Sequence, residues 1–205
     1  MEEDDLVEMT VRSYDECAEE YSRYHFGKSF RNRLGIFLEH LPDGELVLDV
    51  GCGSGRDVKY LIEHGINAIG IDLSKRIVAQ AKKYVPEATF HHMDMRKLTF
   101  EESTFSGILA MASVLHLPKR ELPDLLAEFS RVLKEGGLLY LSLIAGSREK
   151  IVRRSVAVEG MGPRFFAFYE MEELKNSLGR ARFDIVHSFV DEDLGVDWLN
   201  VYAKK

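Results

Sequence analysis

The sequence is poor in cysteine and proline and has no long apolar segment. Its 205 residues include 2 cysteines and 5 prolines. Two cysteines exclude a disulfide-rich scaffold and a zinc site built from four cysteines. No apolar run approaches the roughly 18 residues that a helix needs to cross a bilayer, so we expect no membrane span. The chain starts with an acidic stretch, where a secretory signal would be basic and then apolar, so we expect a cytoplasmic protein.

Acidic residues outnumber basic ones. The chain has 27 Lys and Arg against 34 Asp and Glu, a formal net charge of −7. Binding to nucleic acid depends on clustered basic side chains, so this balance argues against a nucleic acid partner. The hydrophobic share of 45% is ordinary for a globular protein and too high for disorder. We expect one globular domain, with or without an appendage, and a small-molecule partner.

The chain divides at an early turn. Residues 11–41 have a helical pattern with many aromatic rings, and residues 42–44, Pro-Asp-Gly, then break it. We expect residues 1–41 to form an N-terminal helical segment, packed outside a main domain over residues 42–205. The five acids within residues 2–9 predict a solvated, frayed start.

Strand and helix patterns alternate after this turn. Short apolar runs predict strands over residues 46–50, 68–71, 107–111 and 138–144, and the less apolar residues 89–92 predict a further strand. Ser74 can cap one intervening helix, and an apolar stripe from Leu122 to Leu133 predicts another, which Gly136-Gly137 ends. Strands that alternate with helices form βαβ units and a mainly parallel sheet.

The last third has a different pattern. Residues 171–178 predict a helix, and residues 183–189 and 198–203 predict two strands. The connection between these strands is too short for a helical crossover, so they should pair antiparallel as a hairpin. The predicted fold class is α/β: a Rossmann-like, doubly wound, mainly parallel sheet with a C-terminal antiparallel hairpin.

A glycine-rich loop follows the first predicted strand. Residues 51–55 read Gly-Cys-Gly-Ser-Gly, and glycine there lets a ligand approach the backbone. The dinucleotide fingerprint G-x-G-x-x-G needs a glycine where Arg56 stands, and no Gly-Lys-Ser/Thr of a Walker loop follows. The loop is therefore not built for phosphates, whereas Asp49, just before it, fits a cationic ligand.

Two further acids stand at the ends of the next two strands. Asp72 lies about 20 residues after Gly51, the first glycine of the loop, and at that spacing a carboxylate can bind both hydroxyls of a ribose. Asp94 follows the third strand, where an acid could accept the amine of a base. Each has an ordinary alternative, since Asp72 could cap a helix and Asp94 a turn. Three acids at successive strand tips suit an adenosine that carries a positive charge.

Five segments, in order, resemble the class I S-adenosylmethionine-dependent methyltransferases, and within them the small-molecule, ubiquinone-biosynthesis-like group. The segments are Leu48–Gly55, Gly70–Ser74, Met93–Met95, Phe105–Ala110 and Arg131–Gly137. One departure, Ser106 where relatives often carry an acid, lies at a strand start, away from the ligand end. The resemblance implies S-adenosyl-L-methionine as cofactor and methyl transfer as activity.

The resemblance implies two groups of cofactor-binding residues. On the methionine side they are Asp49, near the amino group, and the backbone around Gly51, Gly53, Ala110 and Met111. On the nucleoside side they are Asp72 for the ribose, Leu73 against the adenine, Asp94 for its amine and Met95, through its amide, for a ring nitrogen. The alternative for the glycine loop is a plain turn from strand to helix.

The N-terminal helical segment is expected to act as a lid, as it does in relatives. A tyrosine of the lid touches the cofactor there, and we choose Tyr21 over Tyr14. The alternative is that these rings only fasten the helix to the domain. Residues 165–169, rich in Phe and Tyr, are a candidate second wall of the acceptor pocket or part of the core. A basic run after the fifth strand could meet an anionic acceptor or stay solvated: Arg148, Lys150, Arg153 and Arg154.

Methyl transfer from a sulfonium needs orientation more than acid–base chemistry. His116, just past the fourth strand, is the candidate catalytic base, because a histidine titrates near neutral pH. The alternative is a histidine that only hydrogen-bonds a neighbouring loop. We expect no metal site. Residues 110–113, Ala-Met-Ala-Ser, stand where many methylases of nucleic acid bases carry Asp/Asn-Pro-Pro-Tyr, which again argues against a nucleic acid substrate.

The expected function is methyl transfer from S-adenosylmethionine to a hydroxyl, amine, carboxylate or carbon of a small metabolite. The alternative is a non-catalytic module that binds the same cofactor. A nicotinamide dehydrogenase is disfavoured by the missing third glycine. We expect a monomer or a homodimer.

Overall fold

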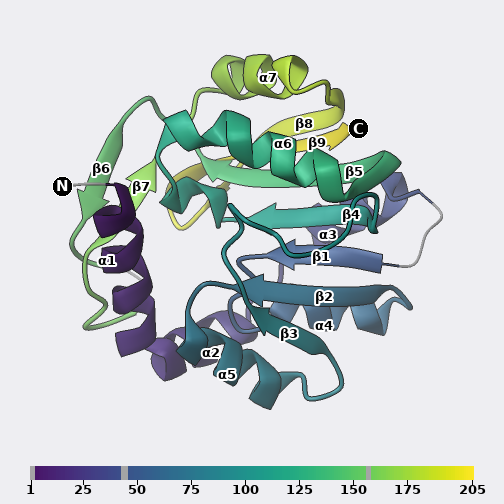
Figure 1. Cartoon of the computed structure of the whole chain (residues 1–205). Coiled ribbons are helices and arrows are strands. Elements are labelled where there is room, and N and C mark those ends of the chain that lie inside the picture. The colour runs from purple at the N-terminus through teal and green to yellow at the C-terminus, as the bar shows by residue number, and fades with distance from the viewer. Residues whose placement is uncertain (1–2, 43–45, 156–157) are drawn as a thin grey trace.

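A seven-stranded sheet forms the centre of the molecule in the computed structural model, which describes residues 3–42, 46–155 and 158–205 (Figure 1). The strand order is β3-β2-β1-β4-β5-β9-β8. The first five pair in parallel, and β9 pairs antiparallel with β5 and β8. The strands are β1 (Leu46–Val50), β2 (Asn67–Asp72), β3 (Thr89–His92), β4 (Phe105–Met111), β5 (Leu133–Ile144), β8 (Asp184–Asp193) and β9 (Val196–Lys204). The predicted α/β fold class is confirmed.

Helices cover both faces of this sheet. One face packs against α6 (Leu122–Val132) and α7 (Met171–Arg180), and the other against α3 (Arg31–His40), α4 (Arg56–Glu63) and α5 (Lys75–Tyr84). Alternate residues of β5 point to opposite faces of the sheet and are buried in its two cores. Leu139 and Leu141 join the first core, and Leu138 and Tyr140 the second. A strand buried on both faces needs such an unbroken apolar run, which is why the sequence predicted it.

The C-terminal hairpin is tighter than the sequence indicated. Strands β8 and β9 are joined by Leu194 and Gly195 alone, with φ angles of +54° and +73°. Positive φ at both central residues is the geometry of a type I′ turn, whose twist matches that of the flanking strands. The predicted antiparallel pairing is confirmed, and it places β9 in the interior of the sheet, beside β5.

The predicted helix end at Gly136-Gly137 is wrong. Helix α6 ends at Val132, and Leu133 is already extended and pairs with Phe105. Gly136 has a φ of +71°, and the chain rejoins the ladder only at Leu138. The two glycines therefore form a bulge within β5, which an apolar pattern does not reveal.

The N-terminal segment is three helices rather than one stretch. They are α1 (Glu3–Glu16), α2 (Ala18–Phe26) and α3, with breaks at Cys17 and over residues 27–30. The predicted frayed start is wrong from Glu3 onward, because α1 packs on the domain and buries Val7 in its main core. Residues 43–45, which include the last two residues of the predicted turn 42–44, lie outside the described residues.

A small second sheet was missed by sequence reasoning. Strands β6 (Glu149–Val152) and β7 (Arg164–Ala167) pair antiparallel and lie beside α1 (Figure 1). Two short 3₁₀ helices, η1 (Val114–His116) and η2 (Lys119–Glu121), connect β4 to α6. Within the ranges that the structure describes, no helix is long and apolar enough to cross a bilayer.

Candidate active site

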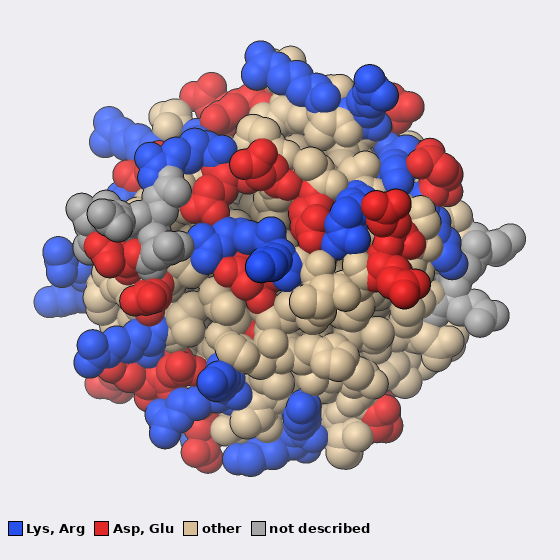
Figure 2. Space-filling model, viewed as in Figure 1, with Lys and Arg blue, Asp and Glu red and all other residues tan. Residues whose placement is uncertain are grey.

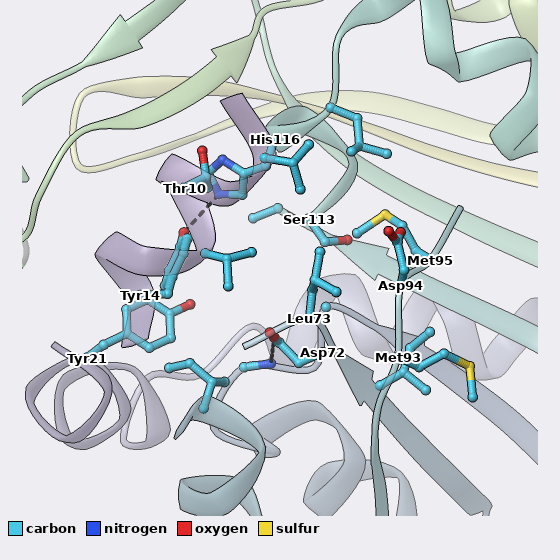
Figure 3. Close-up of a pocket in the computed structure, with 18 residues that line it drawn as sticks. Thr10, Tyr14, Tyr21, Asp72, Leu73, Met93, Asp94, Met95, Ser113 and His116 are labelled. Carbon is cyan, nitrogen blue, oxygen red and sulfur yellow. Dashed lines mark hydrogen bonds between the residues drawn. The ribbon is translucent and has the colours of Figure 1, made fainter. Parts of the chain in front are cut away.

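Two adjoining cavities lie where the parallel strands end, with α1 and α2 across them. The first has a volume of about 90 Å³, and Figure 3 shows its lining. The second is larger, about 230 Å³, and lies beyond the glycine loop. Tyr14, Tyr21 and His116 line both. The carboxyl ends of the strands are where ligands bind in open α/β sheets, so these cavities form the candidate site.

The glycine loop after β1 closes tightly under the first cavity. The amides of Gly51 and Cys52 both donate to the carbonyl oxygen of Ile71, at 2.8 and 2.9 Å. Gly51 has a φ of +71°, and a Cβ built on it would stand 2.4 Å from the Cβ of Ser113. Only glycine fits there. The loop therefore holds bare backbone of Gly51 and Gly53 against the cavity.

Asp72 is fixed at the tip of β2 by two backbone amides. Its Oδ2 accepts from the Gly53 amide at 3.2 Å (Figure 3). Its Oδ1 accepts from the Ser74 amide at 2.9 Å. Ser74 in turn caps α5 by accepting from the Ile77 amide. Burial raises the pKa of Asp72 to about 6. A carboxylate has about four acceptor sites, so Asp72, which lines the cavity, retains capacity for a ligand's hydroxyls.

Asp94 lines the first cavity but is already engaged. Its two oxygens accept from the backbone amide and the guanidinium of Arg96, at 2.8–3.2 Å. A ligand amine would share Asp94 with this internal ion pair. Apolar Leu73 and Met95 line the cavity beside it, so the structure brings together all four residues of the expected nucleoside side.

Asp49 and Ala110 line neither cavity. Asp49 lies under the glycine loop, 2% exposed, and its Oδ2 has no hydrogen-bond partner among the described residues. Burial, and then the nearby carboxylate of Asp57, hold its pKa well above the ordinary value. Ala110 is fully buried in the sheet, whereas its neighbour Met111 lines the second cavity. The structure therefore places two expected cofactor residues behind the cavity walls.

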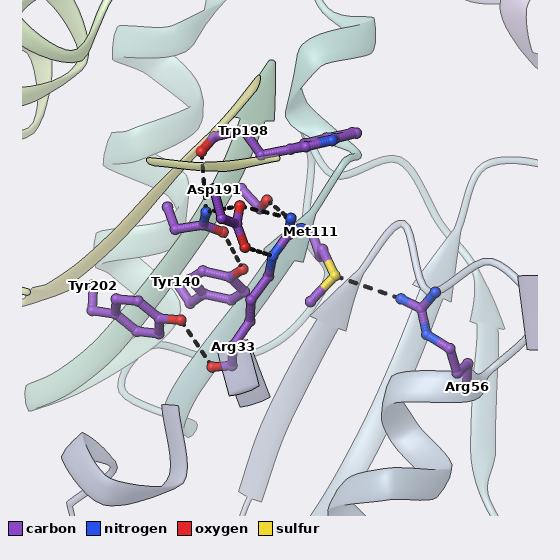
Figure 4. A network of polar contacts seen from close by, with 9 residues as sticks. Arg33, Arg56, Met111, Tyr140, Asp191, Trp198 and Tyr202 are labelled. Carbon is purple, nitrogen blue, oxygen red and sulfur yellow. Dashed lines mark hydrogen bonds and ion pairs between the residues drawn. The ribbon is translucent and has the colours of Figure 1, made fainter. Parts of the chain in front are cut away.

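Two arginines of the second cavity are bound to their own acids. Arg56 donates to the carboxylate of Asp57 from its Nε and Nη2, at 2.7 and 2.6 Å. Arg33 likewise donates to the carboxylate of Asp191 from its Nε and Nη2, at 2.9 and 2.8 Å, and this ion pair joins α3 to β8 (Figure 4). The ring of Phe30 lies against both guanidinium groups, 4.5 Å from that of Arg56 and 4.9 Å from that of Arg33.

Tyr14 and His116 form a direct polar contact between α1 and the domain. The Tyr14 hydroxyl lies 2.8 Å from His116 Nε2, and His116 Nδ1 lies 2.8 Å from the carbonyl oxygen of Phe165. A carbonyl only accepts, so Nδ1 carries the hydrogen and Nε2 accepts from Tyr14. Burial lowers the pKa of His116 to about 4, so its ring is neutral near pH 7. Burial raises the pKa of Tyr14 to about 12, which keeps its hydroxyl a donor.

Sequence reasoning placed some of these residues and missed others. Tyr21 lies over the glycine loop, its hydroxyl 3.5 Å from a Cβ built on Gly53. Phe166, of the aromatic stretch 165–169, lines the second cavity. None of the four residues of the basic run, all described, lines either cavity. Tyr14 was ranked below Tyr21, and its bond to His116, 102 residues away, left no local signal. In the parts of the chain that the structure describes, no cluster of His, Cys, Asp or Glu could hold a metal ion.

Comparisons with known proteins agree with this geometry. A family model described as a methyltransferase domain matches residues 47–137. Sterol 24-C-methyltransferase of Saccharomyces cerevisiae is 33% identical over 130 residues, which cover 57% of this chain and 33% of that protein. A SAM-dependent methyltransferase of Methanosarcina mazei has a TM-score of 0.74 at 22% identity, covering 83% of this chain and 96% of that one.

A second solved structure covers nearly the whole chain. It is 1,6-didemethyltoxoflavin-N1-methyltransferase of Burkholderia thailandensis, with bound 1,6-didemethyltoxoflavin and S-adenosylhomocysteine. Its TM-score is 0.71 at 22% identity, covering 99% of this chain and 86% of that one. At such identity the likeness shows the fold. The chain spans between 33% and 53% of the length of the first curated relatives that it matches.

Proposed function

Residues 47–137 are a class I S-adenosylmethionine-dependent methyltransferase domain, and from that premise we propose that the protein transfers a methyl group from S-adenosylmethionine to a small-molecule acceptor. One observation carries the proposal. Asp72 is held at the tip of β2 by the amides of Gly53 and Ser74 and faces the cavity with acceptor capacity to spare. This is the arrangement that binds the two hydroxyls of a ribose.

The residues of the first cavity fit the cofactor. Gly51 keeps backbone open where a Cβ would collide, and the buried hydroxyl of Ser113 has no partner among the described residues. Leu73 and Met95 offer apolar surface for a base, and Asp72 offers acceptors for the sugar. Asp49 lies buried behind the loop and lines neither cavity, so it does not touch a ligand held there. When bound, the cofactor supplies a methyl group activated by a positively charged sulfur.

The chain's own contribution is to orient the acceptor, exclude water and receive a proton. We assign the last role to His116 acting with Tyr14, which lie where the two cavities meet. The Phe165 carbonyl fixes the ring so that Nε2 accepts from the Tyr14 hydroxyl, and a proton from the acceptor reaches Nε2 through that hydroxyl, which gives up its own proton as it takes the new one. With a pKa of about 4, His116 is a weak base. It therefore suits an acceptor whose proton becomes acidic only as the bond to the methyl carbon forms.

We propose that residues 1–41 act as a lid over the domain of residues 42–205. Hydrogen bonds fasten α1 to the domain in two places. On one side Tyr14 bonds to His116, Ser13 Oγ donates to the Pro163 carbonyl at 2.6 Å, and the Phe165 amide donates to Thr10 Oγ1 at 3.0 Å. On the other, Asp15 accepts from Ser74 Oγ at 2.6 Å and from Arg76. In this lid Tyr21 covers the glycine loop and faces the cofactor site.

We also propose a cytoplasmic protein that acts without nucleic acid, as a monomer or a homodimer. Cys17 and Cys52 carry free thiols, which suits a reducing compartment. On the face shown in Figure 2, Lys and Arg are interspersed with Asp and Glu rather than gathered in a basic patch. Mobility-shift assays with RNA and DNA, and light scattering of the purified chain, test these assignments.

Calorimetry with S-adenosylmethionine and S-adenosylhomocysteine tests the cofactor site. We expect both to bind, and Asp72→Ala to weaken both by about 10- to 100-fold, because a charged acceptor contributes about 1.5–3 kcal/mol. Asp184→Ala, at an exposed aspartate of β8, is the matched control and should bind normally. Unchanged affinity in Asp72→Ala would contradict the ribose role.

A second experiment separates catalysis from binding alone. The protein is incubated with S-adenosylmethionine labelled in the methyl group and with fractionated metabolite pools. We expect label in a small molecule and release of S-adenosylhomocysteine. Tight cofactor binding without transfer to any pool would favour the non-catalytic module.

A further inference from the structure

The second cavity contains a buried cation with no acid of its own. Arg164, the first residue of β7, is 8% exposed and lines the cavity. Its Nε–H is buried without a hydrogen-bond partner, and no salt bridge to Arg164 exists among the described residues. A buried guanidinium is costly unless it is paired, so such a group calls for an explanation.

The other charges around the cavity are balanced. Arg33 and Arg56 each form a two-point ion pair with an aspartate. Lys28 and Asp193 also line the cavity, and their single charges are opposite. Arg164 therefore leaves the cavity with one uncompensated positive charge, which a monovalent anion would neutralise.

Arg164 is held in place on both sides along the chain. The carbonyl of Pro163 accepts from Ser13, and the amide of Phe165 donates to Thr10. The guanidinium lies over the ring of Phe166, 5.2 Å from its centroid. This contact offsets only part of the cost of burial. With the flanking backbone held and the guanidinium packed on a ring, binding a ligand costs Arg164 less entropy than it would cost a mobile arginine.

The walls around Arg164 favour a flat, apolar molecule with an oxyanion at one end. Phe30, Phe166 and Trp198 present aromatic surface to the cavity. The indole Nε1–H of Trp198 likewise has no hydrogen-bond partner among the described residues. An indole N–H and a guanidinium can only donate hydrogen bonds, so a ligand that pairs with them must carry acceptor atoms.

We propose that the methyl acceptor is a small carboxylic acid with a flat apolar body, and that Arg164 binds its carboxylate. This inference rests on the proposed function, because it names the acceptor of the same reaction. A carboxylate has the single negative charge that the cavity lacks and the planar pair of oxygens that a guanidinium binds best. His116 lines the same cavity, so an acceptor held by Arg164 lies within the reach of the Tyr14–His116 pair.

Ligand-observed NMR with matched probes tests the proposal on the full chain, with and without saturating S-adenosylhomocysteine. The probes are benzoate, its neutral counterpart benzamide, and phenyl phosphate. We expect benzoate to bind about tenfold more tightly than benzamide, since a charge-assisted hydrogen bond is roughly twice as strong as a neutral one. Arg164→Gln should remove this preference, and Arg153→Gln, at an exposed arginine beside β6, should keep it.

A second measurement uses the wild-type chain alone, so it does not depend on the folding of a variant. In ¹⁵N-labelled protein, benzoate should shift the Nε–H resonance of Arg164, and benzamide should not. Equal binding of benzoate and benzamide to the wild-type chain, or a preference that survives Arg164→Gln, would overturn the proposal, and tighter binding of phenyl phosphate would overturn the choice of carboxylate. A chain that fails to bind S-adenosylhomocysteine refutes the proposed function instead, whatever the probes show.

Discussion

The hydroxyl of Tyr14 donates to Nε2 of His116 across 2.8 Å and joins α1 to the connection after β4. Because His116 Nδ1–H donates to the Phe165 carbonyl at 2.8 Å, both ring nitrogens are occupied. The two contacts fix the tautomer and the orientation of the imidazole where the two cavities meet, and burial keeps the ring neutral. Four predictions follow from this and from other contacts of the site.

Tyr14→Phe should lower kcat by about 100-fold, the lower end of the range for lost acid–base assistance. Cofactor affinity should change by less than about twofold, because the ring and its packing remain. His116→Gln should have a similar effect. The double variant should be little worse than either single one, since residues that act as a unit are not additive. Rates from S-adenosylhomocysteine release test this, and additive losses would contradict a joint role.

His116 should make the protein less stable in mild acid. Its folded pKa is about 4, below the ordinary 6.5. Between these values the unfolded chain binds a proton that the folded chain does not, so the free energy of unfolding falls as the pH falls through this window. His116→Gln should therefore lose less stability than the wild-type chain between pH 7 and pH 5. Urea denaturation at both pH values measures the difference, and equal losses would contradict it.

Asp72 titrates in the opposite sense, so the wild-type curve alone does not isolate His116. Burial raises the pKa of Asp72 to about 6, so the folded chain keeps this proton to higher pH than the unfolded chain. Its contribution is present at low pH and is lost as the pH rises from about 4 to 6. Because Asp72 is present in both proteins, its contribution cancels when the stability of His116→Gln is compared with that of the wild type.

Gly51→Ala should destabilise the protein and abolish cofactor binding. The left-handed backbone costs a non-glycine residue about 1–2 kcal/mol, and the new Cβ would also meet Ser113 at 2.4 Å. Gly65→Ala is the matched control, because Gly65 has a φ of +78° but no atom within 4 Å of a built Cβ. Gly65→Ala should lose only the stability that the left-handed backbone costs a non-glycine residue. Thermal melts compare them, and Gly51→Ala/Ser113→Gly should recover the steric part.

Asp191→Asn should destabilise the protein by about 2 kcal/mol, because it leaves the buried guanidinium of Arg33 without its partner. The side chain of Arg33 is 5% exposed and that of Asp191 36%, so water screens the pair only from one side. Glu16→Gln breaks a comparable contact to Arg12, but those side chains are 58% and 81% exposed. It should cost less than about 0.5 kcal/mol. Chemical denaturation tests both, and equal costs would contradict the role of burial.

The parts of the site that sequence reasoning placed well depend on neighbours in the chain. Asp72 follows its strand directly, and Gly51 and Gly53 follow theirs, so chain order and the parallel sheet bring them to one edge. The central strands could be predicted from local sequence as well, because a strand buried on both faces needs a continuous apolar run.

The parts that it missed depend on contacts between distant segments. The pairing of β6 with β7 spans residues 149–167, and neither strand has a marked periodic pattern. The isolation of Arg164 is invisible in the sequence, because it depends on which arginines find an acid once the chain is folded. Arg56 was read only as a mismatch to a fingerprint, yet the fold pairs it with its neighbour Asp57 and stacks it on Phe30.

The three hydrogen bonds from α1 to Pro163, Phe165 and His116 have a consequence for turnover. In the proposed lid the same helix borders both cavities, so opening one would open the other. Donor and acceptor would then share a single entrance, and exchange of the spent donor would expose the methylated product to solvent in the same opening.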